Sequence, residues 1–336
     1  MTQHLSTRLL SNLTRNINIT AREQDRRKTA APSFQHDRRL QKTETQCFTV
    51  GIAMPKTRNG LGNLLFDYAG VMYVASYTGR TPLLLTWSHQ TKLDQAFDLD
   101  IARMTSEQKQ CPVKDYYQSG VYAKYAYNNA ITRLIAVDAN VALKLQGAFY
   151  GWKYTQPIED QLRSKLQFRR EVSAFVDKFL FTNVPAGWNS STFVRVGVHV
   201  RRGDFLSGWA VKRGFTVASK HYLNRSMMYF VERYRRVQFI VASNDVGWCR
   251  KNIIFSSFDQ KRVNVTFSVK HSTAQDLALI ARCDHTVMTT GTYGWWASWL
   301  SKGITVYYKQ FPRRGSSLWQ EFSASDFYLP TWIGMD

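Results

Sequence analysis

The chain has 336 residues, with 45 Lys and Arg against 24 Asp and Glu, which gives a net charge of +21. Its 44% hydrophobic and 14% aromatic content excludes a disordered or fibrous protein, and its length suits two domains. Such an excess of positive charge favours phosphate-bearing ligands, polyanions or an anionic membrane surface. The basic residues are dispersed, and the sequence contains no zinc-finger spacing, basic zipper or aromatic ribonucleoprotein motif, which argues against nucleic acid.

Residues 1–46 are expected to form a polar, basic and flexible stem. Residues 1–45 carry nine Lys and Arg against four Asp and Glu and show no sustained hydrophobic period. The sequence has no run of about 18 apolar residues and no apolar core of a signal peptide at its amino end. We therefore expect no membrane-spanning segment in this chain.

The cysteine and sequon pattern favours a secretory compartment. The four cysteines are Cys47, Cys111, Cys249 and Cys283, and no pair forms a CxxC that would indicate a zinc or thioredoxin-type site. Two disulfides are allowed in three connectivities, and Cys249 with Cys283 is a candidate pair because both are expected to follow strands of one sheet. Five Asn-x-Ser/Thr sequons begin at Asn12, Asn18, Asn189, Asn224 and Asn264.

The first ordered elements are predicted as strand, glycine turn, helix and strand. A short strand spans Phe48–Ile52, and Leu83–Leu85 reads as a second, buried strand. Between them, apolar residues from Leu64 to Ala75 follow the spacing of one helix face. Asn63 is the predicted N-cap, Asp67 is placed in the first turn, and Gly79 is the predicted stop of this helix.

The middle of the chain is expected to be mostly helical between residues 90 and 185. Trp152 and Ile158–Phe168 are the helix candidates there. The segment Pro185–Ser191 has the composition of a linker. We therefore predict an N-terminal domain over residues 47–188 and a C-terminal domain over residues 189–336.

The second half alternates strands with helices. A capping box at Ser272 to Gln275 opens one helix, and Tyr293–Leu300 forms another. The predicted strands are Phe193–Val200, Val237–Ala242, Val263–Phe267, Thr286–Thr289 and Ile304–Tyr307. This alternation predicts an α/β fold with a mostly parallel, doubly wound sheet.

Three polar clusters follow the carboxyl ends of these strands, at His199–Asp204, Ser243–Asp245 and Thr290–Gly294. Open α/β sheets bind ligands at that edge, so the clusters predict one binding crevice. Arg201 and Arg202 suit phosphate, because a guanidinium group is planar and always charged. Since neighbouring side chains of a strand point to opposite faces, only one arginine is expected to face the crevice. We assign Arg201 to the ligand and Arg202 to the loop, where Asp204 is its expected partner.

Two glycine-containing turns, Gly60–Asn63 and Thr290–Gly294, each precede a predicted helix. Helix amino termini with free N–H groups bind anions. Asn244 and Asp245 either read a base or ribose, or form a turn before a helix. The sequence contains neither a P-loop nor a full GxGxxG, so kinase-like and dehydrogenase functions lose support.

These motifs together resemble a known family. Val196–Asp204 is similar to the HxRRxD signature shared by α1,2-, α1,6- and protein O-fucosyltransferases. Three further stretches resemble the galactoside α1,2-fucosyltransferases specifically. They are Asp276–Thr286 continuing to Thr290–Ala297, Gly60–Asn63 with Tyr68 and Ala69, and Ser243–Asp245 with Trp248–Arg250. The resemblance runs from about residue 50 to 310 with the motifs in the same order.

The resemblance implies two Rossmann-like domains in a GT-B architecture. The N-terminal domain (47–188) would lie on the acceptor side and contribute to the donor site, and the C-terminal domain (189–336) would bind GDP-fucose. The resemblance also implies inverting, metal-independent transfer of L-fucose from GDP-β-L-fucose to the 2-hydroxyl of a terminal β-galactoside, with no cofactor. Arg201 would bind the diphosphate and assist departure of GDP, and Asp204 is the candidate general base. The implied donor-binding residues are Gly60, Gly62, Asn63, His199, Arg202, Asn244, Asp245, Gly291, Thr292 and Tyr293. Among them, His199 and Asp245 would contact guanosine, and Gly291, Thr292 and Tyr293 the pyrophosphate.

The resemblance leaves alternatives open. A fucosyltransferase of another linkage, α1,6 or protein O-linked, and a non-catalytic GDP-sugar or glycan-binding protein remain to be compared. Phe205 and Leu64 replace a tyrosine and a glutamine that are usual in the family. The expected partners are GDP-fucose and a β-galactoside glycan on a glycoprotein or glycolipid. The family also implies a type II protein of the Golgi membrane, so membrane association would need an anchor that this chain lacks.

Overall fold

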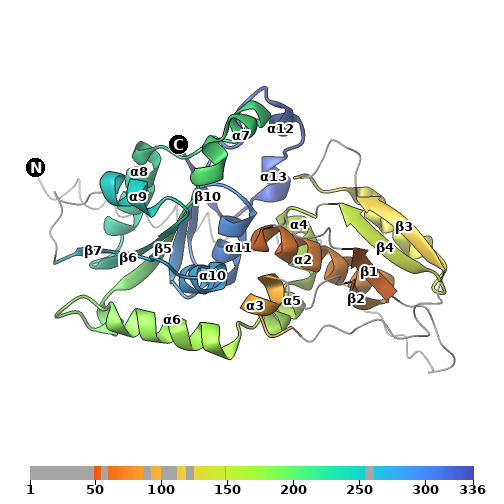
Figure 1. Ribbon diagram of the computed structural model, residues 1–336, viewed down its shortest axis with the longest axis horizontal. Coiled ribbons are helices and arrows are strands. Elements are labelled where there is room, and N and C mark those ends of the chain that lie inside the picture. The colour runs from red at the N-terminus through yellow and green to blue at the C-terminus, as the bar shows by residue number, and fades with distance from the viewer. Residues whose placement is uncertain are drawn as a thin grey trace, which may run out of the picture. The chain divides into compact units, whose positions relative to one another are not determined.

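Two parallel β-sheets, one from each half of the chain, organise the protein (Figure 1). The computed structural model describes residues 49–53, 60–85, 92–99, 112–118, 125–147, 149–253 and 261–336. The expected stem over residues 1–46, together with Cys47 and Cys111, lies outside the described residues. We call the first sheet with its helices the N-terminal lobe, and the second sheet with its helices the C-terminal lobe.

The N-terminal lobe contains a four-stranded sheet in the order β2-β1-β4-β3, with every pairing parallel. Its strands are β1 (Thr49–Ala53), β2 (Thr81–Leu85), β3 (Val113–Gln118) and β4 (Ala142–Gly147). The expectation that residues 90–185 are mostly helical is therefore wrong at β3 and β4. Short apolar segments such as Leu143 and Leu145 fit a buried strand as well as a helix, and their pairing partners are remote in sequence.

Helix α2 (Leu61–Thr78) connects β1 to β2 and is buried along most of its length. Gly79 ends it in the left-handed conformation at φ 67°, as predicted. Two predictions at its start are wrong. Gly60 is the N-cap, so Asn63 lies inside the first turn, and Asp67 lies beyond that turn among buried residues.

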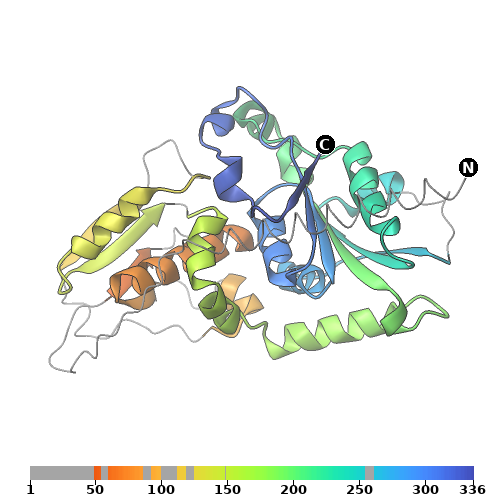
Figure 2. The same cartoon turned by 180° about the vertical axis from the view of Figure 1, so that it is seen from behind.

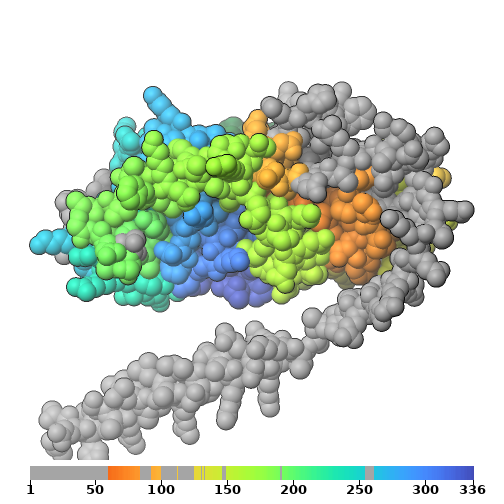
Figure 3. Space-filling view, turned by 90° about the horizontal axis from the view of Figure 1, so that it is seen from below, coloured from red at the N-terminus to blue at the C-terminus, as the bar shows by residue number. Residues whose placement is uncertain are grey.

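The rest of the N-terminal half is built from short helices and one longer one. They are α3 (Lys92–Ala96), η2 (Asn129–Ala136), α4 (Trp152–Thr155), η3 (Gln156–Ile158), α5 (Glu159–Lys165) and α6 (Arg170–Thr182). Helical structure at Trp152 and over most of Ile158–Phe168 is confirmed. Helix α6 precedes the predicted linker but packs against α10 of the C-terminal lobe, and it forms a surface ridge in Figure 3. The domain boundary at residue 188 stays a prediction.

The C-terminal lobe contains a six-stranded parallel sheet in the order β10-β9-β8-β5-β6-β7. Five of its strands confirm the predicted ones to within one residue at each end, and β10 was not predicted. The strands are β5 (Val194–Val200), β6 (Val237–Ser243), β7 (Val263–Phe267), β8 (His285–Met288), β9 (Thr305–Tyr308) and β10 (Ile333–Met335).

Helices connect these strands on both faces of the sheet. The helical segments are η4 (Ser190–Thr192), η5 (Gly203–Leu206), α7 (Gly208–Arg213), α8 (Lys220–Val231), α9 (Val246–Asn252), α10 (Thr273–Ala281), α11 (Thr292–Ser301), α12 (Ser317–Gln320) and α13 (Ala324–Phe327). The predicted capping box is present, with Ser272 and Gln275 each bonding the other's backbone N–H. The doubly wound parallel sheet is therefore confirmed.

The connections reverse direction between β5 and β8, which are neighbours in the sheet. From β5 the chain crosses to β6 through α8, whereas from β8 it crosses to β9 on the other side through α11. Helix α8 lies on one face, and α10 and α11 on the opposite face (Figures 1 and 2). A ligand crevice is expected at the carboxyl ends of two strands whose connections diverge in this way.

The two lobes pack through α2 and α11. The Phe66 ring of α2 lies 4.6 Å from the ring of Trp295 and 5.0 Å from that of Trp296. The end of the chain returns to the N-terminal lobe, where the Asp326 carboxylate accepts the Tyr127 N–H at 3.1 Å and pairs with Lys153 at 2.5 Å. Residues 46–336 accordingly form one compact unit.

Cys249 and Cys283 are both free and buried, so the candidate disulfide between them is wrong. Cys249 lies in α9, beyond the carboxyl end of β6, whereas Cys283 lies between α10 and the beginning of β8. In a parallel sheet these positions lie at opposite ends of the strands. Burial also raises the pKa of both thiols.

Candidate nucleotide-sugar site

Thr289 joins the two loops at the point where the connections of β5 and β8 diverge. The Arg201 backbone N–H donates to the Thr289 hydroxyl at 2.9 Å, and the Thr289 N–H donates to the carbonyl of His199 at 3.1 Å. The residues after β5 are therefore held beside the loop that leads into α11. Sequence reasoning missed Thr289, although it directly precedes the predicted cluster at Thr290–Gly294.

The two adjacent arginines separate as the strand geometry predicts. Arg201 is 37% exposed in its side chain and pairs with Asp204 at 2.7 Å. Arg202 is only 13% exposed, stacks on the Trp248 ring with its guanidinium carbon 3.8 Å from the ring centre, and approaches the Asp245 carboxylate at 3.6 Å. The predicted pairing of Asp204 with Arg202 is wrong, because the turn of η5 carries residue 204 back beside residue 201.

Asn244 fixes the loop that carries the arginines. Its side-chain oxygen accepts the Arg202 backbone N–H at 2.9 Å, and its amide group donates to Asp204 at 3.3 Å. A Cβ at Gly203 would collide with this amide, so glycine is required there. The structure thus places Asn244 within one polar cluster with Arg201, Arg202 and Asp204.

Asp245 is the N-cap of α9 and accepts the Trp248 N–H at 3.1 Å. This confirms the alternative in which the polar pair forms a turn before a helix. The second carboxylate oxygen lies toward Arg202, so the aspartate and the stacked guanidinium support each other. Its contact with a base or ribose stays a prediction.

His199 is the last buried polar residue of β5 and is neutral. Burial, and secondarily the charge of Arg201, lowers the pKa of His199 to about 3. Its ring lies 5.2 Å from the Tyr293 ring, and its Nδ1 atom is buried with no hydrogen-bond partner among the described residues. A Cβ at Gly294 would collide with Nδ1, so this glycine lets α11 approach β5 closely.

The amino termini of α2 and α11 meet close to the loop that carries Arg201. Gly60 and Gly291 are their N-caps, and neither helix has a side chain capping it. Gly291 has φ 93°, a backbone conformation that favours glycine. The Thr292 hydroxyl donates to the Asn63 side-chain oxygen at 2.6 Å, and a Cβ at Gly62 would overlap the backbone of Tyr293. Two helix dipoles and one arginine therefore favour an anion at this junction.

The structure thus brings the predicted site residues into two adjacent groups. Gly62, Asn63, Gly291, Thr292 and Tyr293 form the junction of the helix termini, and Gly60 caps α2 beside it with open space around its Cα. The other group surrounds the loop after β5, and His199 connects the two through Tyr293.

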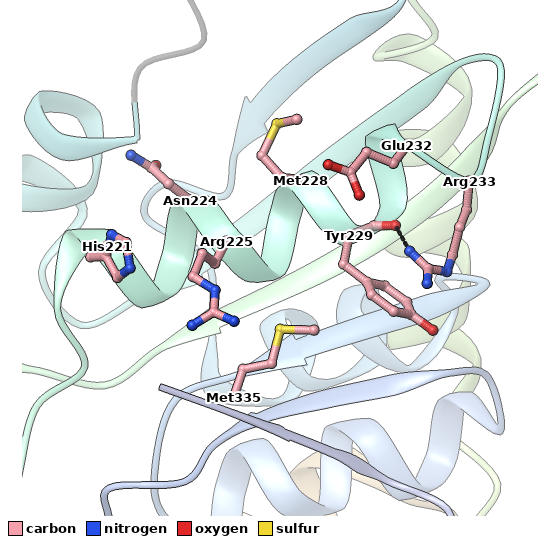
Figure 4. Close-up of a pocket in the computed structure, with 8 residues that line it drawn as sticks. All are labelled: His221, Asn224, Arg225, Met228, Tyr229, Glu232, Arg233 and Met335. Carbon is pink, nitrogen blue, oxygen red and sulfur yellow. Dashed lines mark hydrogen bonds between the residues drawn. The ribbon is translucent and has the colours of Figure 1, made fainter.

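A separate hollow of about 520 Å³ lies along α8, at the edge of the sheet formed by β10 (Figure 4). Its lining includes His221, Arg225, Glu232 and Met335, and Arg233 donates to the Tyr229 carbonyl at 2.9 Å. It shares no residue with the predicted site, so we do not assign the nucleotide to it. Within the described ranges, three or more His, Cys, Asp or Glu side chains nowhere gather as metal ligands.

Comparison with known proteins decides the family. Residues 16–336 match the family described as Glycosyl transferase family 11. The chain belongs to glycosyl transferase family 11. This confirms the resemblance to galactoside α1,2-fucosyltransferases and the class of glycosyltransferase.

Curated members similar to this family 11 chain include three mammalian enzymes. It is 36% identical over 201 residues to galactoside alpha-(1,2)-fucosyltransferase 1 of Sus scrofa, covering 58% of this chain and 53% of that protein. It is 29% identical over 289 residues to galactoside 2-alpha-L-fucosyltransferase Sec1 of Mus musculus, covering 85% and 74%. It is 29% identical over 280 residues to galactoside alpha-(1,2)-fucosyltransferase 2 of Sus scrofa, covering 82% and 77%. The match to the first of these spans about half of that relative's length.

A solved structure confirms the fold of this family 11 chain. FUT1 of Arabidopsis thaliana, a mutant in complex with GDP, superposes with a TM-score of 0.50 at 13% identity, covering 79% of this chain and 71% of that one. The α/β fold with two parallel sheets is the expected GT-B architecture. No helix in the described segments is both long and apolar enough to span a membrane.

Proposed function

We propose that the protein transfers L-fucose from GDP-β-L-fucose to the 2-hydroxyl of a terminal β-galactoside, with inversion at the fucose carbon and without a metal ion. The observation that carries this proposal is the junction at Arg201. A partly exposed guanidinium group and two helix amino termini without side-chain caps lie together where the connections of β5 and β8 diverge. This arrangement suits a diphosphate bound at the carboxyl edge of a parallel sheet.

The chemistry of the reaction explains why positive charge is gathered there. Departure of GDP concentrates negative charge on the β-phosphate, and prearranged donors lower the barrier by stabilising that charge. Arg201 is paired with Asp204 in this structure, but both groups are partly exposed, and exposed ion pairs contribute little stability. The guanidinium group of Arg201 can therefore move to a bound diphosphate while Asp204 and Asn244 hold the loop in place.

The residues beyond Arg201 form a second part of the proposed donor site. Arg202, stacked on Trp248 and backed by Asp245, presents a flat, polar edge at the end of β6. We assign this edge and the neutral His199 to the guanosine. Support comes from the position of Arg202 and Asp245 after β5 and β6, and from the buried Nδ1 atom of His199, which has no hydrogen-bond partner among the described residues.

The acceptor assignment rests on the relatives, which are named galactoside α1,2-fucosyltransferases. The N-terminal lobe is the proposed acceptor side because α2 brings Asn63 against Thr292 from there. By the same reasoning from relatives, we propose the Golgi lumen as the working compartment. Fractionation of the native protein checks this, and a cytosolic pool carrying the activity would contradict it.

The decisive experiment incubates the purified protein with GDP-fucose and β-galactoside acceptors, with and without EDTA. NMR of the product should show an α1,2 linkage at full yield in both samples. Transfer to a different hydroxyl or to a protein side chain would overturn the linkage, and loss of activity in EDTA would overturn metal independence. Binding of GDP-fucose without any transfer would favour a non-catalytic binding protein.

A further inference from the structure

Asp67 is a buried carboxylic acid with no partner. It is 5% exposed, and among the described residues it makes no ion pair and no side-chain hydrogen bond. Buried charges in proteins are nearly always paired, because an unpaired one loses its hydration without compensation. The helix does not require an acid at this position, because residue 67 is neither a cap of α2 nor part of its first turn. Its presence therefore needs a functional reason.

The position of Asp67 in α2 directs it toward the proposed reaction centre. It lies one helical turn after Asn63, which bonds Thr292, and residues four apart lie on the same face of a helix. Two other residues of this face also pack toward the centre of the protein. Phe66 packs on Trp295 and Trp296, and a Cβ at Gly70 would meet the Phe149 ring. Asp67 lies between these two residues on the helix, close enough to Tyr150 of the segment after β4 for the two side chains to interact electrostatically.

The distance along the helix places Asp67 on the acceptor side. One turn is about 5.4 Å, so Asp67 follows Asn63 by about that length along the axis of α2. A sugar attached to a diphosphate at the α11 terminus extends by a similar length. The acceptor hydroxyl must approach the far face of that sugar when the configuration inverts.

The surroundings make Asp67 a base at neutral pH. Burial raises the pKa of Asp67 to about 7, because the ionised form is poorly solvated. Its titratable neighbour is Tyr150, whose pKa is also raised by burial and further by Asp67. A general base acts best when its pKa lies near the working pH.

Asp204, the acid suggested by sequence, is less suited to this role. One of its oxygens accepts a hydrogen bond from Arg201 and the other from Asn244. Each oxygen of this carboxylate therefore already helps to hold the loop. Asp204 also lies on the diphosphate side of the junction, whereas an acceptor reaches the site from the N-terminal lobe.

We propose that Asp67 is the general base of the reaction. This inference rests on the proposed function. As the acceptor 2-hydroxyl oxygen bonds to the fucose anomeric carbon, the carboxylate of Asp67 takes the hydroxyl proton. The bond between that carbon and the β-phosphate oxygen breaks, and its electron pair leaves with GDP. The fucosylated acceptor, GDP and a protonated Asp67 are the products of this step.

The test compares the wild type with Asp67→Asn, which has the same shape but cannot accept the proton. We expect kcat/KM for the acceptor to fall by about 100-fold or more, which is the usual contribution of a general base. The Kd for GDP should change less than about twofold. The acidic limb of the wild-type pH profile, near pH 7, should disappear in the variant. Asp177→Asn, which removes an exposed surface partner of Arg282, serves as the substitution control and should remain fully active.

Two outcomes overturn the assignment of Asp67 alone. One is an Asp67→Asn enzyme with near wild-type transfer and the same acidic limb. The other is a variant whose loss of activity accompanies loss of GDP binding or of the folded state, which would mean a structural role. A wild-type protein that transfers no fucose to any β-galactoside overturns the proposed function first, and the inference with it, so the two failures are distinguishable.

Discussion

The Thr292 hydroxyl of the C-terminal lobe donates a 2.6 Å hydrogen bond to the side-chain oxygen of Asn63 in the N-terminal lobe. These two residues are 229 positions apart in sequence, and each lies in the first turn of its helix. The bond holds two helix amino termini beside each other, so the positive ends of both dipoles act on the same space. A donor site at this junction depends on both lobes, and the predictions below test that dependence.

Gly62→Ala should disrupt the junction. A Cβ at this position would overlap the Tyr293 backbone, which lies in a helix and cannot move aside cheaply. We expect affinity for GDP-fucose to fall by about tenfold or more, measured by calorimetry.

Gly208→Ala is the matched control for this substitution. Gly208 begins α7, outside the predicted site, and a Cβ there would meet nothing within 4 Å. This variant should bind GDP-fucose as the wild type does. Equal effects of the two substitutions would contradict the role of the close approach.

Arg201→Ala should abolish measurable transfer and leave the fold intact. The side chain is partly exposed, and among the described residues its one ion pair is with the exposed Asp204, so its removal costs little stability. Loss of charge stabilisation on the leaving group typically costs 10²–10³-fold in kcat. Turnover and thermal unfolding should be measured together. Arg201→Lys should recover only part of the rate, because it retains the charge without the planar fork.

Asn244→Ala should weaken donor binding without touching the donor directly. The substitution leaves the Arg202 N–H without its acceptor and removes one hydrogen bond to Asp204. The loop after β5 should then become disordered, and KM for GDP-fucose should rise several-fold. Steady-state kinetics at saturating acceptor provides the measurement. An unchanged KM would mean that Thr289 alone holds the loop.

His199 should make the protein sensitive to acid. Its pKa is about 3 in the folded protein and about 6.5 when unfolded, so the unfolded chain binds more protons between these values. His199 therefore leaves the free energy of unfolding unchanged above about pH 6.5. As pH falls from there toward 3, His199 lowers this free energy by up to ~1.4 kcal/mol per pH unit. Urea unfolding of His199→Gln across this range should show a shallower slope. His221→Gln, at an exposed position, should retain the wild-type slope.

Asp67 should have the opposite pH dependence. Its pKa is raised to about 7, so the folded state holds a proton that the unfolded state loses above about pH 4. The free energy of unfolding is therefore highest at low pH, where Asp67 is protonated in both states, and it decreases as pH rises from about 4 to 7. Asp67→Asn should raise the free energy of unfolding at pH 8, by an amount on the order of a few kcal/mol, and should change it little at pH 4. Equal stability of the two proteins at pH 8 would show that Asp67 is solvated or paired.

Much of the C-terminal lobe could be predicted because its signals are local. The alternation of buried strands with capped helices specifies a parallel sheet, and the capping box at Ser272 needs only four consecutive residues. The two arginines also separate as expected, because adjacent side chains of a strand point apart. In the N-terminal lobe, β3 and β4 were missed because their identity as strands depends on pairing with each other and with β1.

The family and the parallel sheet could be predicted from motifs and periodicity along the chain, and the same motifs predict a site at the carboxyl ends of the strands. The contacts among the residues of that site became known from the folded structure alone. Asp204 pairs with Arg201, the two cysteines lie at opposite ends of the strands, and Asn63 bonds Thr292. It also showed that Asp67, which reads as an ordinary helix residue, is buried without a counter-charge. Burial and pairing are properties of contacts between distant segments, and the spacing of residues along the chain does not contain them.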